Sequence, residues 1–281
     1  MFQLIRTPKR VSRFTILFLA ASLVCASLTL AAMFAPKVRP LPWTTPTERY
    51  DRSFHSIQTV HKLYARVEAL GAGKSIHDKV FILEQLLRDR FYAGYARYSF
   101  HDNWIAWLSA KAINPDYDAI VAPNDILAND WAACSQQAIV VQAVLQKMGV
   151  PFASVGVEHH FFSVASLGGE WVIVDPFGPI ARDRTRLHKL EEVMTREGRD
   201  RYFITPESKA FGQSFAWKVP EVKSINQFPA PRALLFHQLT AWASDWLWLV
   251  LLACAFASQA IRQRWQFVVR IEDRRMAAAT T

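Results

Sequence analysis

Three residues of this chain have the types and the order that a thiol nucleophile requires: Cys134, His160 and Asp175. A cysteine attacks a carbonyl carbon as its thiolate, so it needs a lowered pKa, which a helix N-terminus and a neighbouring histidine can supply. The histidine needs a third group, commonly a carboxylate or an amide, that holds it in one tautomer. The chemistry that such a set of residues suits is nucleophilic catalysis by a thiol.

Each of these residues also has a structural interpretation. Cys134 could be a buried structural cysteine, His160 could pack in a core beside two phenylalanines, and Asp175 before Pro176 could simply end a strand. The other two cysteines, Cys25 and Cys254, lie in long apolar segments. Cys134 is therefore alone in the rest of the chain and has no disulfide partner there. The ordered set of three favours chemistry over three unrelated structural roles.

A helix is predicted to begin at Cys134. Residues 138–148 are almost continuously apolar, which predicts a helix buried on most of its circumference. Asn129 and Asp130 are candidate N-terminal caps, Gly149 supplies the C-terminal cap, and Pro151 prevents continuation. Backbone amides at the start of such a helix can also stabilise an oxyanion.

A β-hairpin is predicted to bring the histidine to the aspartate. The segments 152–157, 159–167 and 170–176 are short and rich in β-branched and aromatic residues, and Gly168-Gly169 separates the last two as a turn. With a two-residue turn, opposing residues have numbers that sum to 337, so His160 lies opposite Phe177. Asp175 is two residues before Phe177 and is therefore a diagonal neighbour of His160 on the same sheet face. His159 points to the opposite face, and a bulge or an odd loop would reverse this choice.

The segments WAACSQQAIVVQAVLQKMGVPFASVGV and HFFSVASLGGEWVIVDP resemble the transglutaminase-like core of the papain-like cysteine superfamily. The resemblance covers about residues 129–176 and matches Cys134, the Met148–Pro151 segment, His160 with Phe162, and Trp171 through Asp175-Pro176. It implies an α+β fold in which the helix that bears the cysteine packs on a small antiparallel sheet. It also implies that Cys134 is the nucleophile, His160 the base and then the acid, and Asp175 the orienting group.

One departure from the family concerns the residues before the nucleophile. Many members have glycine near the cysteine, whereas this chain has Trp131-Ala132-Ala133. The side chain that would donate to the oxyanion is not placed by the resemblance, and the candidates are Asn129, Trp131 and Trp104.

Helices are predicted upstream of the core. Apolar residues recur at helical spacing from Phe54 to Leu70, where Gly71 and Gly73 end the run. Ser75 with Asp78 resembles a capping box for a second helix that continues to Phe91. A third helix is expected over 103–113, a loop over 113–127 and a surface helix over 185–198. Residues 199–232 look irregular.

Two apolar segments predict membrane spans. Residues 14–35 form 22 positions without a charge, which is long enough to cross a hydrocarbon core of about 30 Å. The second segment is cleanest over 246–261, and the tryptophans near its start suit an interfacial belt. A cleaved signal peptide is the alternative for the first, and a buried core helix the alternative for the second.

Charge placement predicts an orientation. The two tails hold nine basic and two acidic residues, which give +7 of the formal +9. Under the positive-inside rule both termini are cytoplasmic, so the high pI reflects topology and does not indicate nucleic-acid binding. The expected order is a basic tail 1–13, a span 14–35, a linker 36–50, an exported periplasmic domain 51–232, a span 240–261 and a tail 262–281.

These features favour a two-pass inner-membrane enzyme that acts on an amide-bearing protein or peptide. Water as the acceptor would make it a peptidase or amidase, and an amine would make it a transglutaminase; hydrolysis is favoured because water is always available. The alternative from another class is a non-catalytic binding or assembly protein with the same fold. We expect no cofactor and no metal, because no second histidine or cysteine cluster has ligand spacing.

Overall fold

The computed structural model describes residues 11–36, 50–157, 160–177, 186–195, 197 and 224–279. It is a mixed α+β structure with small sheets and two long apolar helices. The chain divides into two compact units. One unit comprises Met1–Lys37, Tyr98–Asn114 and Gln238–Thr281, and the other comprises Val38–Arg97 and Pro115–His237. The predicted exported segment is therefore divided, because residues 98–114 belong with the long helices.

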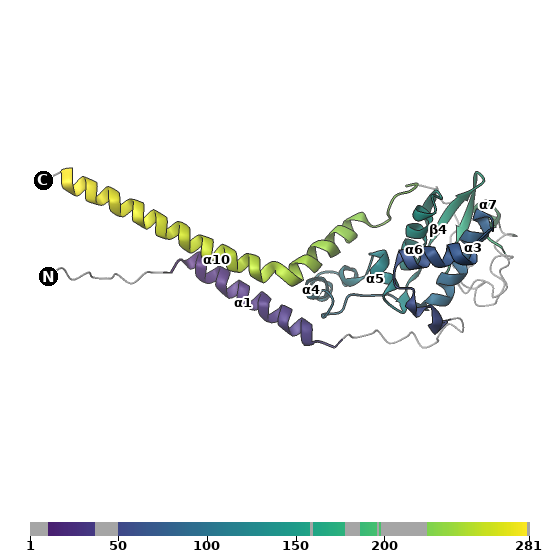
Figure 1. Ribbon diagram of the computed structural model, residues 1–281, viewed down its shortest axis with the longest axis horizontal. Helices are drawn as coiled ribbons and strands as arrows, with labels where there is room; N and C mark the ends of the chain where they lie inside the picture. The colour runs from purple at the N-terminus through teal and green to yellow at the C-terminus, as the bar shows by residue number, and fades with distance from the viewer. Residues whose placement is uncertain are drawn as a thin grey trace. The chain divides into compact units, whose positions relative to one another are not determined.

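The described residues of the first unit form two helices and most of a third, which begins at Pro231 in the other unit. α1 (Arg13–Phe34) matches the predicted first span within one residue. α10 (Pro231–Ala279) begins earlier and ends later than the second predicted span. After Pro231, its first residue, the helix contains no glycine or proline that would stop it before Ala279. Both helices are long and apolar enough to span a membrane. Figure 1 shows them side by side, with the short α4 (Trp104–Ala112) next to them.

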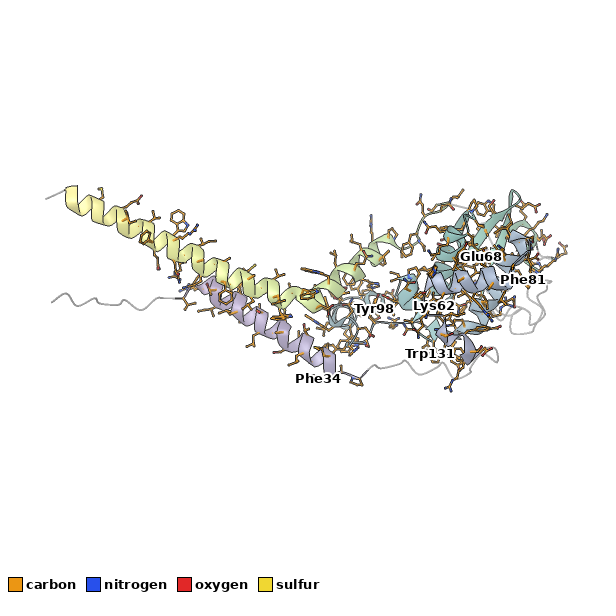
Figure 2. The ribbon with its side chains drawn as sticks, in the orientation of Figure 1. Phe34, Lys62, Glu68, Phe81, Tyr98 and Trp131 are labelled. Atoms are coloured by element: carbon orange, nitrogen blue, oxygen red, sulfur yellow. The ribbon has the colours of Figure 1, made fainter. Side chains whose placement is uncertain are left out.

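Two helices of the second unit, α2 (Val60–Leu70) and α3 (Ile76–Arg90), begin at a side-chain cap that the sequence supplies. Ser75 accepts a hydrogen bond from the backbone N–H of Asp78 at 3.2 Å and donates to its carboxylate at 2.7 Å, which starts α3 as predicted. The predicted helix over 54–70 is wrong in one respect, because it is divided into a 3₁₀ turn (Arg52–Ser56) and α2. The break occurs because Thr59 caps α2 through Lys62 N–H. Figure 2 shows Lys62 and Glu68 on this helix.

Two other predictions are corrected. The expected loop over 113–127 contains a 3₁₀ turn (Pro115–Asp118) and α5 (Pro123–Leu127), which starts at a proline in the first helical position. The expected surface helix over 185–198 is a short strand β6 (His188–Lys189) followed by α7 (Leu190–Met194), because β6 pairs with the edge of the sheet. Most of the irregular 199–232 segment lies outside the described residues.

The main sheet has four antiparallel strands in the order β3-β4-β5-β6: β3 (Phe152–Val157), β4 (His160–Leu167), β5 (Glu170–Val174) and β6. Helix α6 (Cys134–Lys147) lies against β3 and β4, and most of its residues are buried. Figure 1 shows α6 beside β4. A second, two-stranded parallel sheet joins β1 (Tyr92–Ala93) to β2 (Trp131–Ala132), directly before Cys134. The core therefore lies between α6, the main sheet and helices α2, α3 and α5.

Candidate active site

Cys134 is the first residue of α6, as predicted, and its side chain is partly exposed. The predicted caps are wrong: Ala133 occupies the N-cap position, and Asn129 and Asp130 lie outside the helix. Ala133 has no polar side chain, so the cap interaction comes from within the helix, where Gln136 Oε1 accepts from the backbone N–H of Ala133 at 3.1 Å. The helix start is therefore stabilised by Gln136, two residues after the cysteine.

Gln136 makes four hydrogen bonds although its side chain is buried. Besides the bond to Ala133, its Oε1 accepts from Ala96 N–H at 2.8 Å. Its Nε2 donates to the carbonyls of Ala96 and Ile120, each at 2.7 Å. One amide thereby connects three segments distant in sequence and uses its full pairing capacity at both ends. We infer that Gln136 fixes the position of the helix N-terminus that bears the thiol.

A second buried amide joins α6 to the sheet. Gln142 Nε2 donates to Ser154 Oγ on β3 at 2.9 Å and to Ser163 Oγ on β4 at 3.0 Å. Ser163, which is fully buried, donates in turn to the carbonyl of Ala138 at 3.1 Å. Ala138 is one helical turn after Cys134, and Ser163 is three residues after His160. These bonds therefore set the register between the helix that bears the cysteine and the strand that bears the histidine.

The hairpin register agrees with the sequence arithmetic. Leu167 pairs with Glu170 and Ser163 with Val174, so paired numbers sum to 337. Gly168 and Gly169 have φ of +62° and +86°, as a two-residue turn of the I′ type requires. His159, the alternative histidine, lies outside the described residues.

His160 and Asp175 form a buried pair across this hairpin. His160 Nε2 lies 2.8 Å from Asp175 Oδ2, and both side chains are less than 5 % exposed. The other carboxylate oxygen of Asp175 accepts from the backbone N–H of Phe177 at 3.2 Å, which fixes the rotation of the carboxylate. The rings of Phe162 and Phe177 lie 5.7 and 6.1 Å from the imidazole. The pair is thus held in an apolar environment with a defined orientation.

The electrostatics of the site favour a charged imidazole. Burial by itself lowers the pKa of His160, but the charge and hydrogen bond of Asp175, together with a hydrogen bond to the Cys134 side chain and its charge, raise it to about 10. The Asp175 carboxylate therefore favours the charged form of the His160 imidazole. The Cys134 side chain is one of the groups that raise the pKa of His160, so the three residues of the sequence hypothesis lie in one neighbourhood.

The candidate oxyanion donors have different environments. Asn129 donates its amide N–H to the carbonyl of Asp125 at 2.8 Å, and the indole N–H of Trp104 donates to the carbonyl of Ser244 at 3.0 Å. Trp131 is buried on β2, three residues before the cysteine, and its ring stacks on Tyr92 at 4.8 Å. Of the three candidates, Trp131 alone lies on an element that leads directly into Cys134.

A polar cluster anchors the segment before Cys134. Asp130 Oδ1 lies 2.6 Å from His55 Nδ1 and 3.4 Å from Arg90 Nη1, and the Arg90 side chain is almost fully buried. Burial raises the pKa of Asp130, but hydrogen bonds from His55 and Tyr50 lower it below its ordinary value. The carbonyl of Asp130 accepts from Tyr92 N–H at 2.8 Å. Asp130, first considered as a helix cap, therefore holds β2 in place.

Sequence reasoning missed Gln136 and the cluster around Asp130. A signal was present for the first, because four glutamines lie in a helix predicted to be buried on most of its circumference, and buried amides are almost always hydrogen-bonded. Their partners could not be named, since these lie up to 40 residues away. Among the described residues no group of three or more histidine, cysteine or acidic side chains is placed to hold a metal ion.

Comparison with known proteins adds no assignment: no family model, no curated protein and no solved structure matches this chain.

Proposed function

We propose that this protein is a membrane-anchored cysteine enzyme of the transglutaminase-like type that attacks an amide bond and hydrolyses it through a thioester. The observation that carries the proposal is the buried His160–Asp175 pair against Cys134 at the start of α6. Three functional groups in the order nucleophile, base and orienting carboxylate fit thiol acyl transfer. The resemblance to the papain-like core supports the same conclusion.

The first half of the proposed reaction forms the thioester. Asp175 lies at Nε2 of His160, so in the proposed reaction Nδ1 is the nitrogen that would serve the thiol. The Cys134 thiolate attacks the amide carbonyl carbon, and the negative charge that develops on its oxygen is stabilised by N–H groups at the start of α6. The C–N bond then breaks, and the His160 imidazolium gives its proton to the leaving amine.

The second half releases the acyl group. Neutral His160 accepts a proton from water while the water oxygen attacks the thioester carbonyl, and the C–S bond breaks to leave a carboxylic acid and the Cys134 thiolate beside the imidazolium. An amine in place of water would give a new amide by the same steps. The distinction can be measured with casein and a fluorescent primary amine: hydrolysis creates new chain ends without the label, and transamidation incorporates the label.

Thiol reactivity tests the proposal. In the full-length protein, Cys25→Ala and Cys254→Ala leave Cys134 as the one thiol, which is titrated with iodoacetamide at pH 7. We expect His160→Ala to slow alkylation roughly 10- to 30-fold, because an unassisted cysteine is only a few per cent thiolate at that pH. His55→Ala is the matched control, because it removes another histidine–aspartate pair. Equal rates in wild type and His160→Ala would overturn the proposal.

We further propose that α1 and the apolar part of α10 cross the membrane with both termini in the cytoplasm. The basic residues before α1 and after the apolar part of α10 support this orientation. The Cys134 unit, residues 38–97 and 115–237, would then face the periplasm.

A further inference from the structure

Helix α4 has the composition of a membrane helix although it is short. Its nine residues, WIAWLSAKA, contain one charge, that of Lys111 in the last turn. One face is buried, with Ala106 and Ala110 at its centre. The opposite face carries the half-buried Ile105 and the exposed Leu108 and Ala112, with the exposed Lys111 at its border. A surface helix that packs one face on a protein normally presents polar side chains on the other, so an apolar outer face requires an explanation.

Helix α4 is bonded to both long helices of its unit. Asn103, its N-cap, is almost fully buried and donates to Thr240 Oγ1 at 2.9 Å. Ser244 Oγ donates to Asn103 Oδ1 at 3.1 Å. The carbonyl of Ser244 accepts from Trp104 Nε1 at 3.0 Å and from Thr29 Oγ1 at 2.7 Å. α1, α4 and α10 therefore meet at Ser244, and the polar groups at this meeting point are paired internally, as a position at membrane depth requires.

The contacts with α1 give the depth of α4. The His101 ring is hydrogen-bonded to the carbonyl of Ala32 at 2.9 Å, and Thr29 shares the Ser244 carbonyl with Trp104. Thr29 and Ala32 precede Phe34, the last residue of α1, by five and two positions, which corresponds to about 3–8 Å along the helix. Phe34 is labelled in Figure 2 at this end of α1 and is 80 % exposed. The start of α4 thus lies level with the end of the apolar segment.

We propose that α4 is an interfacial membrane helix whose outer face contacts the lipid acyl chains of the periplasmic leaflet. Nine residues extend only about 14 Å, so α4 cannot cross the bilayer and rests at its boundary. Leu108 on α4 and Ile113 directly after the helix are exposed apolar side chains, the latter at 73 %. Two tryptophans, Trp104 and Trp107, suit this boundary. The charges flank the apolar face: Asp102 precedes the cap, and Lys111 lies over the Trp107 ring.

This inference rests on the proposed membrane anchoring and is independent of the proposed catalysis. It is tested in the full-length protein with Cys25→Ala, Cys134→Ser and Cys254→Ala, reconstituted in phosphatidylcholine vesicles. Single cysteines at Leu108 and, as a second position, Ile113 carry a bimane label. Quenching is measured with doxyl-labelled acyl chains and with aqueous iodide. Leu23→Cys, on the exposed side of α1, is the lipid control, and Lys62→Cys, exposed on α2, is the aqueous control.

We expect the labels at positions 108 and 113 to lose fluorescence to doxyl lipid to the same extent as the label at position 23, and to resist iodide. The label at position 62 should respond only to iodide. Iodide quenching at positions 108 and 113, or no quenching there by either agent, would overturn the inference even when Leu23→Cys responds to lipid. Failure of Leu23→Cys to respond to lipid would instead overturn the membrane anchoring itself, and the α4 inference with it. Neither result bears on alkylation of Cys134.

Discussion

Replacing Gln136 by leucine tests whether this buried amide positions the start of α6. Leucine removes four hydrogen bonds, to the peptide groups of Ala96 (two), Ala133 and Ile120. At about 1 kcal/mol each their loss amounts to about 4 kcal/mol. Burial of an apolar side chain in place of the amide offsets roughly 1–2 kcal/mol. We therefore expect the free energy of unfolding to fall by about 2–3 kcal/mol.

The assay is thermal unfolding of the full chain in detergent, followed by tryptophan fluorescence. About 2–4 °C per kcal/mol is typical for a domain of 150–250 residues, so the unfolding midpoint of this unit should fall by about 5–10 °C. Gln146→Leu is the matched control, because Gln146 is exposed on the same helix and surface substitutions usually change stability by less than about 0.5 kcal/mol. A midpoint for Gln136→Leu equal to that of Gln146→Leu would refute the positioning role.

The glutamate variant adds a pH dependence with a definite sign. In Gln136→Glu the second carboxylate oxygen replaces Nε2 and faces the carbonyls of Ala96 and Ile120. Repulsion between these oxygens raises the pKa of the new carboxyl in the folded state above its unfolded value of about 4.3. The stability of this variant should therefore be highest below that value and decline as the pH rises through the folded pKa. A Gln136→Glu protein with the same midpoint at pH 5 and pH 8 would contradict the geometry.

Three further predictions follow from the hairpin and the anchors. Asp175→Asn should move the titration midpoint of His160, measured by NMR, from about 10 toward or below its ordinary 6.5. A raised histidine pKa stabilises the fold below about pH 6.5, and this stabilisation is lost as the pH rises to about 10. Asp175→Asn should therefore lack this stabilisation and its loss between pH 6.5 and 10. Gly168→Asn should leave stability nearly unchanged and Gly168→Val should lower it by about 1–2 kcal/mol in chemical unfolding, because the φ of +62° suits asparagine but not a β-branched side chain. Protease added outside spheroplasts should cleave within residues 36–232 and spare both tails; protection of that segment would contradict the proposed orientation.

The parts of the fold that sequence predicted are those set by neighbouring residues. The end of α6 at Gly149, which has a φ of +69°, and the start of α3 at Ser75 depend on single residues with strong local preferences. The hairpin register depends on the Gly168-Gly169 turn and on strand alternation. From these, the proximity of His160 and Asp175 followed by counting. The structure supplies the distance between them and their common burial.

The parts that sequence did not predict depend on distant partners. Asn129 and Asp130 are the N-terminal caps that the sequence predicts for α6, because both residue types cap helices well. The structure instead uses Asp130 to bind His55, 75 residues earlier, and uses Gln136 for the helix start. The split before α2 was missed because Thr59 lies within an apolar repeat that continues helical spacing on both sides. The assignment of α4 to the unit with the spans was missed because its contacts join residues up to 141 apart.

The two kinds of constraint act on different members of the candidate triad. Turn geometry fixes His160 relative to Asp175, but it has no influence on where Cys134 lies. The cysteine is placed by α6, and α6 is tied to β4 by the Ser163 hydroxyl, which donates to the Ala138 carbonyl while it accepts from Gln142. An entirely apolar interface between helix and sheet would allow small sliding movements, whereas directional hydrogen bonds to a fully buried hydroxyl allow few. The contact between thiol and imidazole therefore depends on polar residues that have no part in the proposed chemistry.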